Sequence, residues 1–146
     1  SAPYAGLFSA VLGDPSLGAG LPGTTPIPIG AAWVGQTLRL PDTEAPNLTF
    51  AYRLVTFDIA RDAMRQVWDV FTVEVNGAVV FSDGNRVATA PGTRYDTGWQ
   101  ETTVDLAAWR GQVAALRFSN WNGRDGAPGA EWYNTWTYLD EVRVQP

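Results

Sequence analysis

Hydrophobic and polar residues alternate most regularly between Trp68 and Asp83. Apolar side chains at Phe71, Val73 and Val75 alternate with polar ones, which is the period of a strand with one buried face. The dipeptide Asn76-Gly77 then suits the two positive-φ positions of a type I′ turn, so this stretch predicts a β-hairpin. The apolar row of its second strand is predicted to contain Val79 and Phe81.

Shorter pieces of the chain carry the same kind of pattern. Asn47–Ile59 has apolar residues on both faces, which indicates a strand in the centre of a two-layer structure. Further strands are predicted from similar alternation at Gln36–Pro41, Gly98–Leu106, Val113–Asn120 and Thr135–Val144. No segment has the period of a long helix, so the pattern predicts an all-β protein.

The first 36 residues differ because they are rich in Gly, Pro and Ala. They hold one apolar run, Leu7–Leu12, and a short β-like piece, Ile27–Ile29, whose neighbouring prolines confine it to a sheet edge or an extended strap. We therefore divide the chain into an N-terminal strap or arm, residues 1–36, and a β-sandwich domain, residues 37–146. The first part wraps its own sandwich, docks on another subunit or is a flexible leader.

Composition removes several classes of chemistry. The chain has 146 residues, no Cys and no His, so we expect one domain without disulfides, thiolates or Ser-His catalysis. A net charge of −5 without any basic stretch argues against nucleic acid, and no apolar run is long enough for membrane insertion. The chain begins at Ser1, which we interpret as the start of a mature or trimmed product.

Three motifs follow one another in a specific order. They are an Asp-to-Gly strand and turn at Asp69–Gly77, a Trp and Val-Asp-Leu pattern at Trp99 and Val104–Leu106 with Gly111, and a closing strand at Leu139–Val142. In this order they resemble the extracellular jelly-roll domains of the MAM-type and galactose-binding-like families, including accessory modules of secreted bacterial hydrolases. The resemblance implies an antiparallel two-sheet sandwich of jelly-roll type, an extracellular or cell-surface location and non-catalytic binding.

Two carboxylates, Asp69 and Asp140, are in phase with core-facing rows at the heads of their strands. A buried carboxylate is costly unless it is paired, hydrogen-bonded or bound to a metal. Related jelly rolls hold a structural calcium near the last strand, so the resemblance implies Ca²⁺ as a cofactor with Asp69 and Asp140 as its ligands. Alternatively, each carboxylate caps a loop or pairs with an arginine such as Arg53 or Arg117. If the two meet at one end of the sandwich, they mark a metal site or a polar anchor.

Aromatic residues concentrate between positions 121 and 138. Exposed indoles can stack on sugar rings while nearby polar side chains bind the hydroxyls. The sequence therefore predicts a carbohydrate-binding site formed by Trp121, Asn122, Asp125, Trp132 and Tyr133, with the two tryptophans stacking. The alternative is that these aromatics fill the core or a subunit interface, which suits Trp136 and Tyr138 better because they lie inside a strand.

The function we expect is a non-catalytic secreted module that recognises a carbohydrate or a cell-surface polymer. The alternative is a structural subunit of an extracellular filament or surface layer, in which copies of the chain assemble by strand addition. The residues for that assembly would be Leu7, Phe8, Val11 and Leu12. A small glycoside hydrolase would need a matched pair of carboxylates, and spacing selects none, so we predict no enzyme activity. The available carboxylates are Asp58, Asp62, Asp69, Glu74, Asp96, Glu101 and Glu131.

Overall fold

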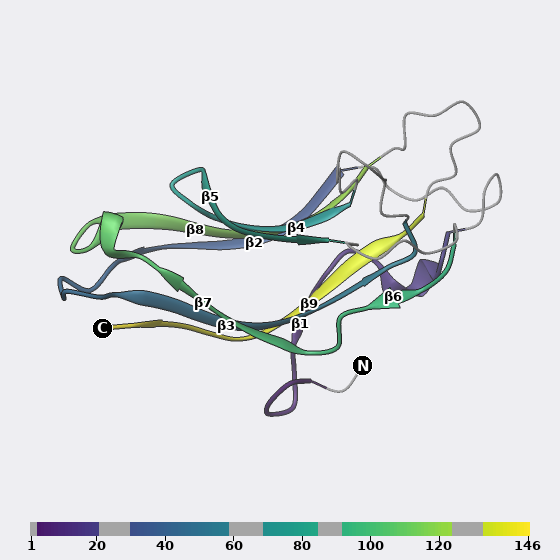
Figure 1. Ribbon diagram of the computed structural model, residues 1–146, viewed down its shortest axis with the longest axis horizontal. Coiled ribbons are helices and arrows are strands. Elements are labelled where there is room, and N and C mark those ends of the chain that lie inside the picture. The colour runs from purple at the N-terminus through teal and green to yellow at the C-terminus, as the bar shows by residue number, and fades with distance from the viewer. Residues whose placement is uncertain (1–2, 21–29, 59–68, 85–91, 124–132) are drawn as a thin grey trace.

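The computed structural model describes residues 3–20, 30–58, 69–84, 92–123 and 133–146, which form two antiparallel β-sheets that face each other (Figure 1). In chain order the strands are β1 (Ala10–Leu12), β2 (Gly30–Arg39), β3 (Asn47–Thr56), β4 (Val70–Val75), β5 (Ala78–Gly84), β6 (Tyr95–Asp96), β7 (Gln100–Asp105), β8 (Val113–Asn122) and β9 (Thr135–Gln145). Two single-turn 3₁₀ helices, η1 (Pro15–Leu17) and η2 (Ala107–Trp109), join them. In the described ranges, no helix is long and apolar enough to cross a membrane.

The strands pair as one long hairpin that is rolled over on itself. β1 pairs with β9, β2 with β8, β3 with β6 and β7, and β4 with β5, all antiparallel. The first sheet therefore has the order β1-β9-β3-β6, with β7 also against β3, and the second has the order β2-β8-β4-β5. This nested pairing is that of a jelly roll, which confirms the predicted fold class.

The hairpin that the sequence predicted is β4 and β5. Asn76 and Gly77 have φ values of 51° and 82°, as a type I′ turn requires. Phe71, Val73 and Val75 are fully buried, so the first strand presents its apolar row to the core as predicted. The Asn76 side chain also accepts the backbone N–H of Ala115 on the adjacent strand β8, which fixes the turn against the sheet.

The prediction for the second strand of the hairpin was wrong at Val79, which is 58% exposed. The register shifts between Val73 and Glu74, so that β5 carries one extra residue. Because an extra residue exchanges the two faces of a strand, Val80 and Phe81 pack against the core instead.

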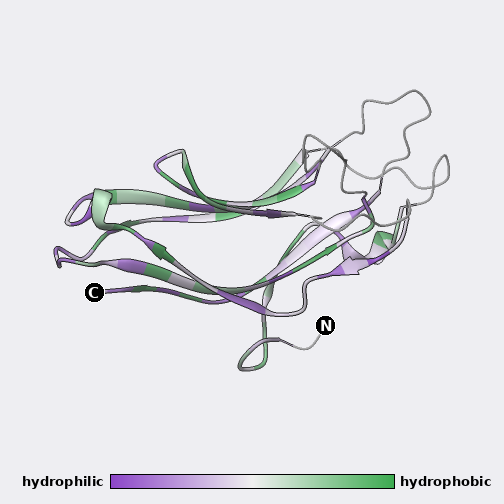
Figure 2. Cartoon of the chain, in the orientation of Figure 1, coloured by the Kyte–Doolittle hydropathy of each residue, from purple (hydrophilic) through white to green (hydrophobic). Residues whose placement is uncertain are grey.

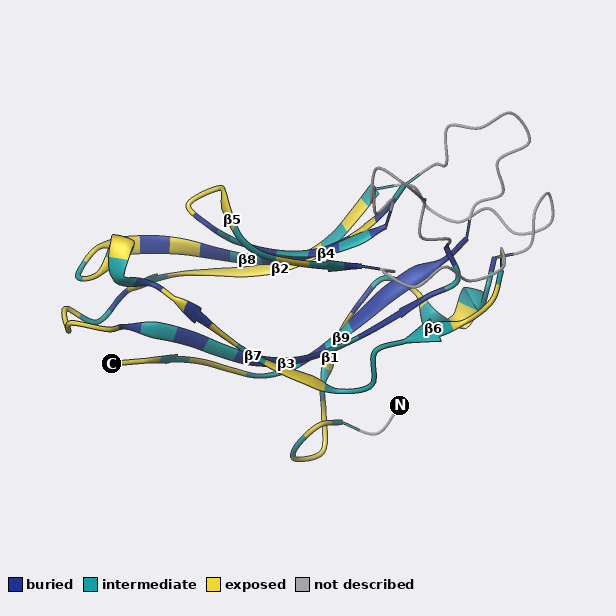
Figure 3. Cartoon of the chain, in the orientation of Figure 1, coloured by how far each residue is buried: buried dark blue, intermediate teal, exposed yellow. Residues whose placement is uncertain are grey.

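Side chains of both sheets fill a single core around Phe50 of β3. Figure 2 shows hydrophobic segments and Figure 3 shows buried segments in strands of both sheets. The Phe50 ring lies 5.5 Å from the rings of Phe81 and Phe118, in edge-on geometry. The outer face of β3 is buried as well, at Ala51 and Val55. β3 is therefore a central strand with two covered faces, as its sequence indicated.

The N-terminal residues lie on their own domain, against the outer face of the first sheet. The Tyr4 ring packs 5.7 Å from the Trp99 ring, and the Tyr4 hydroxyl donates to Glu101 at 3.1 Å. Further along, the carbonyl oxygen of Ala19 accepts the N–H of Asn134 at 3.0 Å. Residues 3–20 form an N-terminal strap that touches the outer face of this sheet at Tyr4 and joins its edge as β1.

β2 crosses the boundary that the sequence placed between residues 36 and 37. It pairs with β8 without a break from Gly30 opposite Asn122 to Arg39 opposite Val113. A Cβ atom at Gly35 would lie 2.7 Å from the carbonyl oxygen of Leu116, so glycine is required by close packing. The Gly-rich composition that indicated an arm reflects, at this position, a strand that lies tightly against its neighbour.

Candidate functional site: the outer face of the second sheet

β8 places consecutive residues of the predicted sugar-binding segment on opposite sides of the second sheet. Trp121 points outward and is 44% exposed, whereas Asn122 is buried between the sheets. Tyr133 is buried too. Asp125 and Trp132 lie outside the described residues. Among the described members of the predicted set, Trp121 is the one that a large ligand can reach.

The sequence analysis missed a second tryptophan on this face. Trp33 of β2 is 60% exposed and stands opposite Ser119, while Trp121 stands opposite Ala31. The two tryptophans are therefore diagonal neighbours on the same face of adjacent strands, a position that puts their Cα atoms about 7–8 Å apart. The guanidinium carbon of Arg117 lies 4.9 Å from the centre of the Trp33 ring, a cation–π contact that orients the indole.

Small and hydroxylated side chains surround the two rings. Ser119 stands opposite Trp33 and two residues before Trp121 on β8, and its Oγ is 2.8 Å from Oγ1 of Thr72 on β4. No bulky residue stands opposite Trp121 on β2, because Ala31 occupies that position. We call this surface the tryptophan face and define it by the residues Ala31, Trp33, Thr72, Arg117, Ser119 and Trp121. It combines two flat apolar rings with the partly exposed Thr72 and Arg117, whose hydroxyl and guanidinium groups can hydrogen-bond a ligand, while Ser119 is buried beneath them.

The sequence did contain a signal for Trp33. Ala31, Trp33 and Gly35 follow the two-residue period of a strand, but four of the seven residues in Gly30–Gln36 are Gly or Ala. Because these small residues lie on both faces of the strand, the two faces differ little in hydrophobicity and the alternation is weak.

Beneath the tryptophan face, β8 and β9 are joined by a buried network of hydrogen bonds. Asn120 donates to the carbonyl oxygen of Thr135 and accepts from Oγ1 of Thr137, both at 2.9 Å. Asn122 accepts the N–H of Thr135 at 2.9 Å and donates to the side chain of Asn134 at 3.3 Å. Buried polar groups are stable only when they are bonded in this way. The Asn122 amide is therefore engaged in holding the two sheets together.

Asp69 lies at the end of this network, just before β4. Its Oδ2 accepts from Oγ1 of Thr135 and its Oδ1 accepts the N–H of Gly123, both at 2.6 Å. Burial raises the pKa of Asp69 to about 7, against the lowering effect of these two hydrogen bonds, and the negative charge of Asp58 raises it further. The Asp69 carboxyl group therefore titrates near neutral pH.

Asp140 was predicted to face the core, and this was wrong. The pairing of β9 with β3 is irregular at this point, and Glu141 has a φ of 51°, so that Leu139 takes the core position. Asp140 lies on the outer face of the first sheet, where its Oδ2 accepts the N–H groups of Tyr4 at 3.0 Å and Ala5 at 3.2 Å. It anchors the N-terminal strap.

The two predicted calcium ligands do not meet. Asp69 contacts Thr135 between the sheets, and Asp140 is five residues further along β9 on the other face, a separation of roughly 17 Å along the strand. Each carboxylate accepts hydrogen bonds from protein groups, and Arg53 pairs with Asp96 at 2.7 Å. No group of three or more metal-binding side chains occurs in the part of the chain that the structure describes. Calcium binding stays a prediction.

The remaining candidate carboxylates are spread over the fold. Asp58 is buried beside the network, Glu74 stands opposite Arg117, and Glu101 accepts the Tyr4 hydroxyl. Asp96 accepts from two arginines, while Asp62 and Glu131 lie outside the described residues. The two that share one end of the sandwich, Asp58 and Asp69, are both buried, so neither is placed to protonate a sugar at the surface.

The predicted assembly residues divide into two groups. Leu12 is buried in the core as the last residue of β1. Leu7 and Phe8 are 83% and 86% exposed, and Val11 is also exposed. The structure therefore leaves the beginning of the apolar run in solvent.

Comparison with known proteins adds no assignment. Neither the models of protein families nor the curated proteins contain a match to this chain.

Proposed function

We propose that this protein is a non-catalytic recognition module that binds a carbohydrate chain, such as a cell-surface polymer, on the tryptophan face. One observation carries the proposal: two exposed indoles, Trp33 and Trp121, are diagonal neighbours on the outer face of the second sheet. Large exposed apolar groups that lie together on a folded domain are typical of interaction surfaces.

The chemistry of the face suits a sugar chain. A pyranose ring has an apolar side of C–H groups and hydroxyls around its rim, so it can lie on an indole while neighbouring groups bind its hydroxyls. Thr72 and Arg117, which are both partly exposed, supply such groups beside the two rings. Because the net charge is −5, a neutral polysaccharide fits better than a polyanion. The resemblance of the sequence to extracellular jelly-roll modules supports an encounter outside the cell.

A depletion assay with insoluble polysaccharides tests the proposal. The protein is mixed with cellulose, chitin, xylan or mannan, and the fraction left in solution is measured. We expect at least one of these polymers to retain the protein, and Trp33→Ala or Trp121→Ala to weaken retention at least tenfold, which is about 1.4 kcal/mol.

Trp99→Ala is the matched control, because it removes an indole from the outer face of the other sheet, where Trp99 packs against Tyr4 and Tyr138. Circular dichroism and melting temperatures establish that each variant is folded. Retention that both Trp33→Ala and Trp121→Ala leave unchanged would refute the proposed site, and no retention by any neutral polysaccharide would refute the proposed ligand class.

A further inference from the structure

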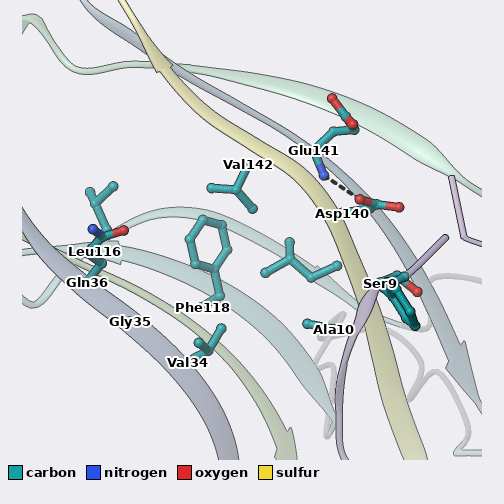
Figure 4. Close-up of a pocket in the computed structure, with 12 residues that line it drawn as sticks. Ser9, Ala10, Val34, Gly35, Gln36, Leu116, Phe118, Asp140, Glu141 and Val142 are labelled. Carbon is teal, nitrogen blue, oxygen red and sulfur yellow. Dashed lines mark hydrogen bonds between the residues drawn. The ribbon is translucent and has the colours of Figure 1, made fainter. Parts of the chain in front are cut away.

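The two sheets are open along one side, where a groove of about 510 Å³ runs between β2 of the second sheet and β9 of the first. Figure 4 shows Val34 and Phe118 on one wall and Val142 on the other. The large apolar side chains that line it are Phe8, Val34, Leu116, Phe118, Leu139 and Val142. Leu116, Phe118 and Leu139 are core residues that stay in contact with the groove because no described strand closes this side.

Both edges of the groove offer unpaired backbone. β2 is the edge strand of its sheet and has no second neighbour among the described strands. The pairing of β9 with β1 ends at Leu139, so the edge from Asp140 to Gln145 has no described partner on that side. Long edges without protection invite pairing with another chain, and β2 carries no proline and only one charged residue, Arg39.

The most exposed large apolar side chains of the described chain are Leu7 and Phe8. They lie in the sequence just before Ser9 and β1, and Phe8 is one of the residues that border the groove. The N-terminal segment turns away from the sandwich here and projects below the first sheet in Figure 1. An apolar projection and an apolar groove are therefore neighbours on one side of the molecule.

Contacts within the same chain keep Leu7 and Phe8 from filling the groove. The register of β1 on β9, continued backwards from Ala10 opposite Leu139, would direct Phe8 to the core side. Instead, the N–H groups of Tyr4 and Ala5 bind the Asp140 carboxylate, which pulls the chain over the outer face. The groove is thus left open to a second molecule.

We propose that this open side is the interface of a two-fold homodimer, in which Leu7 and Phe8 of each copy occupy the groove of the other. A two-fold interface is self-complementary and needs the projection and the groove on the same side, as they are here. Leu7, Phe8, Val34 and Val142 expose an apolar area on the order of 450 Å² per copy, and Phe8 alone accounts for roughly the low end of the 150–250 Å² that an aromatic side chain buries. Two copies would bury about 900 Å² of apolar surface, and the polar residues that line the groove add the rest of the roughly 1,000 Å² expected of a specific interface.

Sedimentation equilibrium or light scattering over a range of concentrations measures the association. We expect a dimer, and at least a hundredfold weaker dimerisation for Phe8→Asp in the projection and for Val34→Asp in the groove. Val79→Asp is the matched control, since Val79 is an exposed valine on β5, the opposite edge strand of the same sheet. This control should remain a dimer. A chain that stays monomeric at millimolar concentration, or dimers that neither Phe8→Asp nor Val34→Asp weakens, would overturn the proposal.

The absence of cysteine allows a direct check of the contact. A Phe8→Cys variant and a Val34→Cys variant are mixed and oxidised, and a disulfide between the two chains is expected at high yield. If the double variant Phe8→Cys/Val34→Cys instead closes a disulfide within one chain and stays monomeric, the groove is filled by its own N-terminal segment and the dimer is refuted. Oxidation to a ladder of larger species would refute two-fold closure in favour of an open filament. None of these measurements involves a carbohydrate, so their outcome tests the dimer without testing the proposed carbohydrate binding.

Discussion

At the scale of single residues, the buried network gives Asp69 two proton arrangements. Oγ1 of Thr135 lies 2.6 Å from Oδ2 of Asp69 and 2.5 Å from Oγ1 of Thr56. The one hydroxyl proton of Thr135 goes to Asp69 when the carboxylate is charged, and it can go to Thr56 when Asp69 carries a proton and donates. Both arrangements keep the hydrogen bonds in place, which is why a carboxyl group is tolerated in this position.

The stability of the protein should therefore depend on Asp69 between about pH 4 and pH 7. The pKa of Asp69 is about 7 in the folded chain and near the ordinary 3.8 when unfolded, so folding favours the protonated acid. The contribution of Asp69 to the free energy of unfolding is complete below pH 4. It falls by roughly 4 kcal/mol at most as the pH rises from 4 to 7, and it is constant above pH 7. Asp69→Asn imitates the protonated acid, so it should match the parent at pH 4 and be more stable at pH 8 in urea unfolding.

Asp96→Asn is the control of opposite sign. Hydrogen bonds from the Arg53 side chain hold the pKa of Asp96 below its usual range, against burial, so its contribution is present above pH 4 and lost as the pH falls. This variant should be less stable than the parent at pH 7. An Asp69→Asn variant that is less stable than the parent at pH 8 would contradict the account of the network.

At the scale of elements, turn chemistry and alternation predicted the strands, and local irregularities limited what could be predicted. The Asn76-Gly77 turn and the buried row of β4 follow from the sequence because both are local properties. The faces of Val79 and Asp140 could not be predicted, because a shifted register reverses the alternation beyond it and depends on the neighbouring strand. Trp33 was missed for another reason: the small residues around it give its strand weak alternation, and its pairing with β8 defines the strand.

The close contact of β2 with β8 gives a test of that strand. Gly35→Ala places a Cβ atom 2.7 Å from the carbonyl oxygen of Leu116, a backbone atom that cannot move aside without shifting β8. We expect a loss of about 1–3 kcal/mol in the free energy of unfolding. Thr37→Ala, on the same face of β2, should change it by less than about 0.5 kcal/mol. Equal stability of Gly35→Ala and the parent would contradict the tight pairing described for β2.

At the scale of the whole molecule, the two sheets present different outer faces. The N-terminal strap covers that of the first sheet, where Tyr4, Trp99 and Tyr138 pack together. The second sheet leaves Trp33 and Trp121 exposed on its outer face. The groove lies along its β2 edge, where the sandwich is open. A dimer formed through the groove would carry two tryptophan faces, and two linked sites bind a polymer more tightly than either alone.

The central claim is that the tryptophan face binds the glycan, and nuclear magnetic resonance tests it most directly. A ¹⁵N-labelled sample is titrated with soluble hexasaccharides of the cellulose, chitin, xylan and mannan series. The account predicts saturable shifts of the indole N–H signals of Trp33 and Trp121 and of the Ser119 amide, with Trp99 and Trp136 unchanged. Saturable binding that leaves the Trp33 and Trp121 signals unmoved would contradict it.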